Sequence, residues 1–145
     1  QEYSFYSTFL ISNNCHFVSN KTYDLLSVST AALVTSGTAT LETALFKVPE
    51  VVCYKGSWLS YQIAKRIVTL KYISLVNLIM DKEVVTELIQ ENCNANTIKI
   101  ELQKLLDSKY RSEILENYKA LELKLGGIGA SQKTAKLIVN NLQKI

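Results

Sequence analysis

Short apolar runs alternate with amphipathic stretches along the first part of the chain. Apolar, β-prone runs typical of buried strands cover Cys15 to Ser19, Ala31 to Val34 and Val51 to Tyr54. Between them, Thr22 to Val28 and Leu41 to Val48 have helical spacing. Strands that alternate with helices in this order predict an α/β fold, in which helices cover a parallel sheet.

The second of these helices has a clear apolar face and a clear end. Its apolar stripe at i, i+3, i+4 and i+7 consists of Leu41, Ala44, Leu45 and Val48. Pro49 is expected to end the helix, because proline cannot continue a helix and disfavours helical geometry in the residue before it.

The middle of the chain continues the mixed pattern. Trp58 to Val68 predicts an amphipathic helix that carries Lys65 and Arg66, Tyr72 to Leu75 a short strand, and Val84 to Gln90 another helix. Trp58, Leu59, Tyr61 and Ile63 are also compatible with a membrane-surface element, although a helix that faces the core with a basic outer edge is favoured.

Residues 96–145 form a predicted helical tail. Helices are expected over Thr97 to Leu106, Lys109 to Leu125 and Ser131 to Leu142. Gly126 and Gly127 suit a left-handed helix cap, and a linker is favoured over a second phosphate loop because a helix precedes them. We therefore expect residues 1–145 to form a single domain.

Composition agrees with one globular domain. The 145 residues are enough to bury a sizeable core. Apolar residues make up 48% and charged residues 20%, values near the globular average, so disorder and fibrous repeats are not indicated. The net charge is only +3 and the basic residues are dispersed, so no nucleic-acid partner is expected.

Cysteine and histidine usage predicts neither a metal nor a cofactor. His16 is the only histidine, and it is interpreted as a strand-end residue and not as a catalyst; no Asp-x-Asp pair is present to hold a metal on a diphosphate. Cys15, Cys53 and Cys93 share no C-x-x-C spacing, which favours reduced thiols in a cytosolic compartment. Cys53 lies in an apolar run and is expected to be an inert core thiol.

No membrane span or secretory signal is expected either. The most lipid-like window, Ile67 to Met80, is interrupted by polar residues and is too short to cross a bilayer. The first residue is Gln1 and not Met, which indicates a piece of a longer protein.

The turn at Ser36, Gly37 and Thr38 is the first candidate site. In an open parallel sheet, the first amides of the helix after a strand point into the ligand crevice, where they and the helix dipole favour an anion. Gly37 lets the backbone approach a phosphate closely, although no Walker sequence is present. Small hydroxyl residues also cap helices without binding anything, so ordinary capping remains an alternative.

Glu42 adds a second feature to this turn. It follows Thr38 by four residues and therefore lies on the same helical face, one residue too far for a capping box. A carboxylate there is free to accept hydrogen bonds from a vicinal diol such as a ribose. Phosphate on the turn and ribose on Glu42 would fit a nucleoside diphosphate, whereas a solvated glutamate favoured by the helix dipole is the alternative.

Several motifs in consistent order resemble one enzyme family. "TSGTATLETALFKVPEVVCYK", followed by "AKRIV", "YISLVNLI" and "ELIQENC", is similar to the C-terminal half of lipid-A-disaccharide synthases. The resemblance runs from about Ala31 to Cys93, with a weaker similarity at "GGIGAS". It implies one half of a glycosyltransferase with two Rossmann-like domains, in which this half binds the donor UDP-2,3-diacylglucosamine.

The resemblance also implies roles for individual residues. Ser36, Gly37, Thr38 and Ala39 would surround the diphosphate, and Glu42 would hold the ribose. Tyr54 and Lys55 match a tyrosine–arginine pair that faces the donor, and Asn77 matches the asparagine of a Leu-Pro-Asn stretch. Lys55 lacks the flat bidentate fork of arginine. Val76 stands in place of the proline, so the loop around Asn77 is expected to be less rigid.

The implied reaction is an inverting attack by the acceptor 6-hydroxyl on the anomeric carbon, assisted by a carboxylate base. No carboxylate of this chain matches that base, so no catalytic residue is assigned and the chain alone is expected to be inactive. The resemblance implies that the base and the acceptor site belong to an N-terminal domain. The implied location is cytoplasmic and peripheral, at the inner membrane face.

Two other functions remain open. A non-catalytic nucleotide-binding or interaction module could use the same fold, and another enzyme that uses UDP-N-acetylglucosamine could share the site. The last predicted helix presents an apolar stripe of Ala135, Ile138, Leu142 and Ile145, which must be covered. It is expected to pack on its own sheet or to be exchanged within a homodimer.

Overall fold

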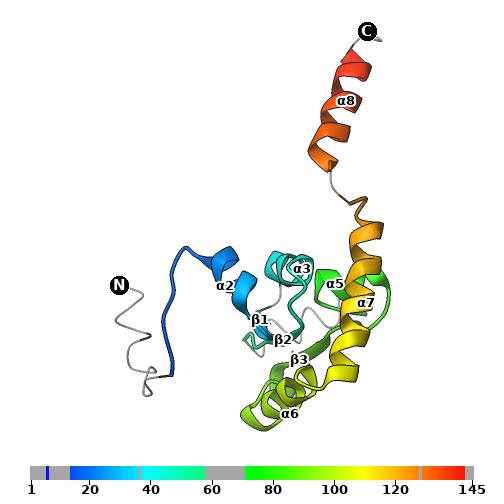
Figure 1. Cartoon of the computed structure of the whole chain (residues 1–145). Helices are drawn as coiled ribbons and strands as arrows, with labels where there is room; N and C mark the ends of the chain where they lie inside the picture. The colour runs from blue at the N-terminus through cyan, green and yellow to red at the C-terminus, as the bar shows by residue number, and fades with distance from the viewer. Residues whose placement is uncertain (1–5, 7–13, 36, 58–70, 128, 143–145) are drawn as a thin grey trace.

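A computed structural model describes residues 6, 14–35, 37–57, 71–127 and 129–142. The described elements follow one another as shown in Figure 1: α2 (Thr22–Val28), β1 (Ala32–Thr35), α3 (Thr38–Leu45), β2 (Glu50–Tyr54), α5 (Leu75–Met80), β3 (Thr86–Ile89), the 3-10 turn η1 (Gln90–Asn92), α6 (Ala95–Leu105), α7 (Ser108–Lys124) and α8 (Ala130–Leu142).

The three strands form one parallel sheet in the order β1-β2-β3. Leu33 of β1 lies opposite Val51 of β2, and Cys53 of β2 lies opposite Leu88 of β3. Parallel strands require crossover connections, which place helices on the faces of the sheet. The expected α/β class with a Rossmann-like parallel sheet and flanking helices is confirmed.

Helices cover both faces of the sheet. In Figure 1, α3 and α5 lie above the strands and α6 lies below them, and α3 contacts β1 and β2 while α6 contacts β2 and β3. The core between these layers is made of closely packed buried side chains: Ala44, Val51, Val52, Val76, Val84, Val85, Leu88, Leu105, Ile114, Tyr118 and Leu121. This packing supplies the hydrophobic stabilisation that holds the strand ends in place.

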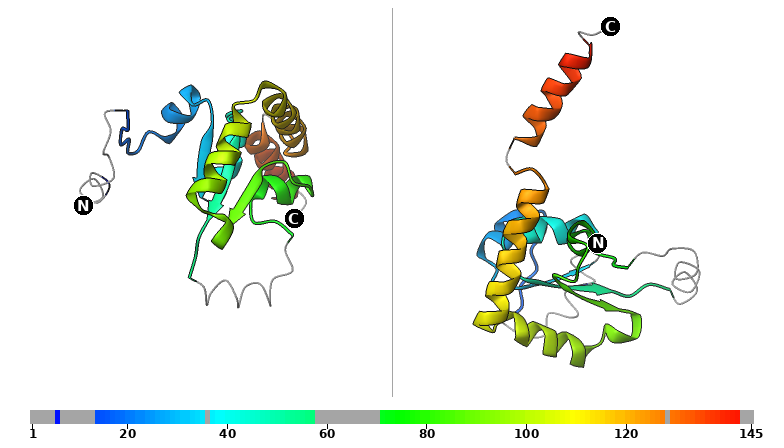
Figure 2. Two further views of the ribbon diagram at one scale, coloured as in Figure 1. Left: turned by 90° about the horizontal axis from the view of Figure 1, so that it is seen from below. Right: turned by 90° about the vertical axis from the view of Figure 1, so that its right-hand side faces the viewer.

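Helix α7 packs across the ends at which the strands begin. Arg111 donates a hydrogen bond to the Thr30 carbonyl just before β1. Tyr118 faces Glu50, the first residue of β2. Ile114 lines a small cavity together with Val84, just before β3. In the right-hand view of Figure 2, α7 runs across one end of the strands, so the opposite, carboxyl edge is the one left for a ligand.

Helix α3 ends earlier than Pro49 alone predicts. Its last residue is Leu45, and Lys47 adopts the left-handed conformation with φ of 60°. The Lys47 amide donates to the Ala44 carbonyl at 3.0 Å and the Val48 amide to the Thr43 carbonyl at 3.2 Å. This pair of bonds is a Schellman motif, which satisfies the last carbonyls and stops the helix before the proline.

Three of the predicted elements are wrong. Cys15 to Ser19 forms no strand: its side chains are mostly exposed, and a strand needs a neighbour to pair with. Tyr72 to Leu75 also forms no strand, because the amides of Ile73 and Ser74 donate to the Glu87 carboxylate and Ser74 is the N-cap of α5.

The third error is Val84 to Gln90, which was expected to be a helix. Residues 86–89 form strand β3, paired along its length with β2. The local sequence is compatible with a helix or a strand. The β-branched residues Val84, Val85 and Thr86 favour the strand once β2 is available to pair with it. The predicted helix over Trp58 to Val68 lies outside the described residues.

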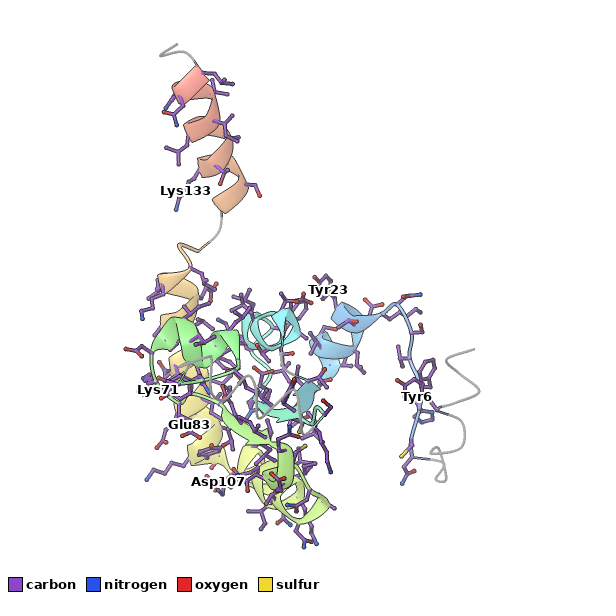
Figure 3. All side chains as sticks on the ribbon, turned by 180° about the vertical axis from the view of Figure 1, so that it is seen from behind. Tyr6, Tyr23, Lys71, Glu83, Asp107 and Lys133 are labelled. Atoms are coloured by element: carbon purple, nitrogen blue, oxygen red, sulfur yellow. The ribbon has the colours of Figure 1, made fainter. Side chains whose placement is uncertain are left out.

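The helical tail is confirmed as α6, α7 and α8. Gly126 and Gly127 have φ of 85° and 63°, so both use the left-handed conformation expected at the end of α7. Figures 1 and 3 show α8, which carries Lys133, projecting from the rest of the protein. Its apolar side chains Leu137, Ile138, Val139 and Leu142 are exposed, so the expected packing of this stripe on the protein's own sheet is not observed. Ile145 lies outside the described residues.

The first residue of β2 is a buried acid. Glu50 is fully buried, and neither carboxyl oxygen has a hydrogen-bond partner among the described residues. Burial raises its pKa from 4.5 to about 9. The Tyr118 hydroxyl faces the Glu50 backbone without meeting hydrogen-bond geometry, and burial raises the tyrosine pKa as well. Glu50 is therefore protonated in the folded protein at neutral pH.

This burial predicts a specific pH dependence of stability. Above pH 4.5 the unfolded chain loses the Glu50 proton while the folded state keeps it, so the free energy of unfolding falls as pH rises toward about 9. Glu50→Gln removes this effect. Between pH 5 and pH 8, urea unfolding of the wild type should lose roughly 2–4 kcal/mol relative to Glu50→Gln.

The matched control is Glu116→Gln, because the Glu116 side chain is 71% exposed. Its stability should follow that of the wild type at every pH. Parallel pH profiles for the wild type and Glu50→Gln would show that Glu50 is not held protonated.

Candidate functional site

The carboxyl ends of the three strands place three turns on one edge of the sheet. Gly37 follows β1, Lys55 follows β2, and Gln90 follows β3. Ligands of open parallel sheets bind beyond this edge, because the following helices begin there with free amides. Strand direction therefore places the turn at Gly37 and the end of β2 at Lys55 on the same edge of the sheet. Ser36, which was also predicted for the site, lies outside the described residues.

The start of α3 leaves backbone amides without acceptors. Gly37 is the residue before the helix, with φ of 140° and no side chain to cap it. Thr38 and Ala39 are exposed, and no described group accepts a hydrogen bond from their amides. A Cβ built on Gly37 meets nothing within 4 Å, so the backbone is open to a ligand. Two free N–H groups at the positive end of a helix dipole favour an anion.

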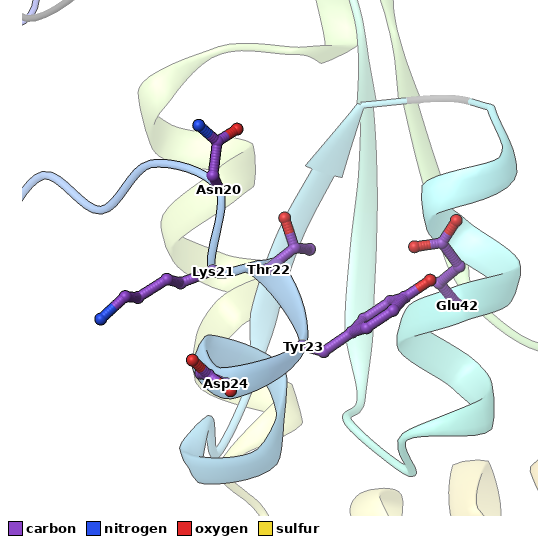
Figure 4. A pocket seen from close by; sticks show the side chains of 6 residues that line it. All are labelled: Asn20, Lys21, Thr22, Tyr23, Asp24 and Glu42. Atoms are coloured by element: carbon purple, nitrogen blue, oxygen red, sulfur yellow. The ribbon is translucent and has the colours of Figure 1, made fainter.

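Glu42 lies one turn further along the same face of α3. Its side chain is half-buried and has no hydrogen bond or ion pair with another described residue. It forms one wall of an open cleft of about 430 Å³, and residues 20–24 form the other. In Figure 4 the Tyr23 ring of α2 points across this cleft toward Glu42. Glu42 is thus available as an acceptor, and it does not cap the helix.

Aromatic packing fixes the other wall of the cleft. The rings of Tyr23 and Phe46 stack with centroids 5.3 Å apart and an angle of 19° between their planes. Such pairs contribute about 0.5–1.5 kcal/mol beyond their burial. The stack joins the start of α2 to the end of α3 and so holds Asn20, Lys21 and Asp24 beside Glu42.

Tyr54 and Lys55 contribute the end of β2. Tyr54 is 42% exposed, and its hydroxyl lies 3.0 Å from the position that a Cβ on Gly56 would occupy. Glycine at position 56 is therefore what allows the tyrosine to fold over the turn. Lys55 is exposed and makes no ion pair with a described residue. The Lys55 ammonium is a free cation on the edge that carries the α3 amides.

Asn77 occupies a different position from these residues. It is fully buried, and its side-chain amide donates to the Val85 carbonyl at 2.8 Å and to the Glu87 carboxylate at 2.9 Å. Its carbonyl oxygen accepts from the Val84 amide at 2.7 Å and the Val85 amide at 3.0 Å. Both donors and both lone pairs are used, so Asn77 has nothing left to offer a ligand in this structure.

Glu87 completes the network around Asn77. Its carboxylate accepts from the Ile73 amide, the Ser74 amide and the Ser74 hydroxyl, at 2.9, 2.9 and 2.7 Å. Charged acceptors make stronger hydrogen bonds than neutral ones. The network ties α5 and the segment before it to β3. The expectation that Val76 leaves this loop less rigid is not tested by these contacts.

Two parts of the site were missed by sequence reasoning. Residues 20–24 precede or begin a helix, and only the packing of α2 on α3 brings them to Glu42. Gln90 is 7% exposed, has φ of 53°, and its side-chain nitrogen has no partner among the described residues. A polar residue directly after an apolar strand was the one available signal for Gln90.

The described residues show no group of three or more His, Cys, Asp or Glu side chains that could hold a metal ion. Within the same residues, no helix is long and apolar enough to cross a membrane. The arrangement can instead bind an anion on the α3 amides, with the Lys55 cation and the Glu42 acceptor nearby.

Comparison with known proteins identifies one family. The family model described as lipid-A-disaccharide synthetase matches residues 4–140. The chain is 36% identical over 126 residues to the lipid-A-disaccharide synthase of Geobacter sulfurreducens, covering 86% of this chain and 33% of the relative. It is 40% identical over 124 residues to that of Syntrophus aciditrophicus, covering 85% and 32%.

A shorter match is more similar. The lipid-A-disaccharide synthase of Psychromonas ingrahamii is 54% identical over 82 residues, which cover 57% of this chain and 22% of the relative. The chain therefore spans about a third of the length of the curated relatives that it matches over most of its own length.

The hydrogen bonds of Asn77 predict a structural effect of its removal. Asn77→Ala leaves the amides of Val84 and Val85 and the Val85 carbonyl buried without partners, so the free energy of unfolding should fall by about 2–4 kcal/mol. Urea unfolding measures this loss. Asn96→Ala is the control, because Asn96 is exposed and the loss there should stay within about 0.5 kcal/mol. Equal stability of the two variants would contradict the structural role of Asn77.

Proposed function

The chain belongs to the lipid-A-disaccharide synthetase family, and we propose that it is the part of such an enzyme that binds the donor UDP-2,3-diacylglucosamine. The observation that carries the proposal is the juxtaposition of two unpartnered groups on α3. The free amides of Thr38 and Ala39 suit a diphosphate, and the unpaired Glu42 carboxylate one turn later suits a ribose diol.

In the proposal, the main contacts to the anion come from backbone amides and not from side chains. In the proposal, the amides of Thr38 and Ala39 donate to the diphosphate, and Gly37 and Ser36 form the turn around it. Lys55 and Tyr54 face the same edge from β2. Breaking the bond between sugar and diphosphate leaves negative charge on UDP, which fixed amides and a nearby ammonium stabilise in the transition state.

The nucleoside lies along the cleft between α2 and α3. Glu42 accepts hydrogen bonds from the ribose hydroxyls, and Tyr23 with residues 20–22 provides the opposite wall. Gln90 is a further donor at the same edge, since its buried side-chain nitrogen lacks a partner among the described residues. Asn77 does not contact the donor in this proposal. It acts indirectly by holding β3 and α5 in place.

The rest of the reaction is assigned to parts of the enzyme outside this chain. The proposed glycosyltransferase attacks the anomeric carbon with the acceptor 6-hydroxyl and inverts its configuration, and a carboxylate of an N-terminal domain takes the proton. The outer edge of β1 pairs with no other described strand, and the α8 stripe is exposed. Both features support contacts with further polypeptide, either the N-terminal domain or a second copy that exchanges α8.

The proposed location is the cytoplasmic face of the inner membrane, with peripheral attachment. The supporting argument is chemical, because donor and acceptor both carry acyl chains that partition into a bilayer. The Trp58 to Val68 segment, for which a helix facing the core is favoured over a membrane-surface element, lies outside the described residues.

Glu42 gives the direct test of the donor site. Glu42→Ala removes a charge-assisted hydrogen bond to the ribose, so UDP affinity measured by calorimetry should fall about tenfold or more, corresponding to about 1.5–3 kcal/mol. Glu42→Gln keeps the shape and one acceptor and should bind with intermediate affinity. Glu116→Ala, on the exposed face of α7, should match the parent.

The outcomes separate two failures. If the parent binds UDP and Glu42→Ala binds equally well, Glu42 is not at the site although the donor function survives. If the parent fails to bind UDP, UDP-N-acetylglucosamine and the acylated donor, the donor function itself is wrong. Tighter binding of UDP-N-acetylglucosamine than of the acylated donor would favour a different enzyme of this architecture.

A second expectation concerns turnover. The purified 145-residue chain should form no disaccharide from donor and acceptor, because the base and acceptor site lie in the N-terminal domain. Mass spectrometry of the lipid products measures this, with a full-length relative as the positive control. Disaccharide formation by the 145-residue chain alone would contradict the assignment of the base and the acceptor site to the N-terminal domain.

A further inference from the structure

The ring of Tyr23 is held in place at one wall of the cleft beside Glu42. Tyr23 lies in the first turn of α2, and its ring stacks on that of Phe46 with centroids 5.3 Å apart and an angle of 19° between the planes. Phe46 is the C-cap of α3, and its amide donates to the Glu42 carbonyl at 3.0 Å. The ring that supports Tyr23 is therefore anchored one helical turn beyond Glu42.

The stack leaves one face of the Tyr23 ring uncovered. Phe46 covers the other face, yet Tyr23 as a whole is 57% exposed. Tyr23 lines the open cleft of about 430 Å³, and Figure 4 shows its ring reaching from α2 toward Glu42 on the opposite wall. Single exposed apolar side chains are common and carry no meaning alone. The Tyr23 ring differs because a second ring fixes its orientation and because it borders a cleft.

Positions along α3 give an order for the parts of a nucleotide. Thr38, Glu42 and Phe46 follow one another at intervals of four residues, so they lie along one face of the helix with a rise of about 6 Å per interval. In the proposed site, the diphosphate lies at Thr38 and the ribose at Glu42. The part of the nucleotide that follows the ribose is the base, and the next position along this face is the Tyr23–Phe46 stack.

We propose that the uracil base of the donor stacks on the open face of Tyr23, while Phe46 supports the ring from the other side. This inference rests on the proposed donor site and adds the place where the base binds. Stacking uses the π-face that every base has, so Tyr23 contributes affinity for a nucleobase and does not select uracil among the bases. Because Phe46 already holds the ring, little conformational freedom is lost when the base binds.

A pair of ligands that differ only by the base isolates this contact. Uridine 5′-monophosphate (UMP) is ribose 5-phosphate with uracil attached, so the ratio of the two dissociation constants measures what the base adds. NMR titration of the 145-residue chain gives both constants. The parent should bind UMP about fivefold or more tightly than ribose 5-phosphate, which corresponds to the lower end of base–aromatic stacking energies.

Three variants assign this difference to the stacked rings. Tyr23→Leu removes the π-face, so it should abolish the preference for UMP and leave the affinity for ribose 5-phosphate unchanged. Tyr23→Phe keeps the π-face and should retain the parent ratio. Phe46→Leu removes the support of the Tyr23 ring and should give an intermediate ratio. The affinity for ribose 5-phosphate serves as the control that the rest of the site is intact in each variant.

The proton signals of uracil give a second readout. Protons that lie over the face of an aromatic ring resonate upfield, so the carbon-bound ring protons of UMP should shift upfield on binding to the parent and to Tyr23→Phe. Binding to Tyr23→Leu should not produce this shift. A role of Tyr23 in folding alone would not place the base over its ring.

The outcomes separate this inference from the donor function. The inference is overturned, and the donor function survives, if the parent binds both ligands with equal affinity. It is equally overturned if Tyr23→Leu keeps the parent ratio and the upfield shift. If the parent binds neither of these ligands nor UDP, the donor site itself is wrong and the inference is refuted with it.

Discussion

Strand direction is the constraint on which the rest of this structure depends. Because β1, β2 and β3 are parallel, every strand begins at one edge of the sheet and ends at the other. Helix α7 packs across the first edge, with Tyr118 fully buried against the start of β2. The start of α3, the end of β2 and the turn after β3 therefore share the opposite edge, and the proposed chemistry follows from what those turns leave unpaired.

The two outer strands, β1 and β3, differ in what lies beside them. Beside β3, Asn77 binds the backbone of Val84 and Val85 just before the strand, and the Glu87 carboxylate binds the segment before α5. On β1, the Ala32 amide donates toward β2 at 2.9 Å, and the alternation of a parallel ladder turns the backbone groups of Leu33 the other way. Leu33 is also 48% exposed. No strand of the described residues pairs with this partly apolar edge, and the chain spans about a third of the length of its relatives.

Features encoded within one element could be predicted from the sequence. The pairing of Thr38 with Glu42 depends only on helical spacing, and α2, α6, α7 and α8 follow from periodicity and caps. Features that depend on distant contacts could not. β3 looks helical until β2 pairs with it, and the hydrogen bonds that Asn77 accepts from Val84 and Val85 depend on how α5 meets the segment before β3. The second wall of the cleft was missed because it depends on the Tyr23–Phe46 stack.

The central claim is that the N-terminal end of α3 binds the diphosphate of a uridine nucleotide. Amide NMR tests this claim most directly. Titration of UDP into the isotopically labelled chain should shift the amide signals of Gly37, Thr38 and Ala39 most, together with those of Tyr54 and Lys55 at the end of β2. Saturable shifts concentrated instead on α7 between Tyr110 and Asn117, at the opposite edge of the sheet, would contradict the account.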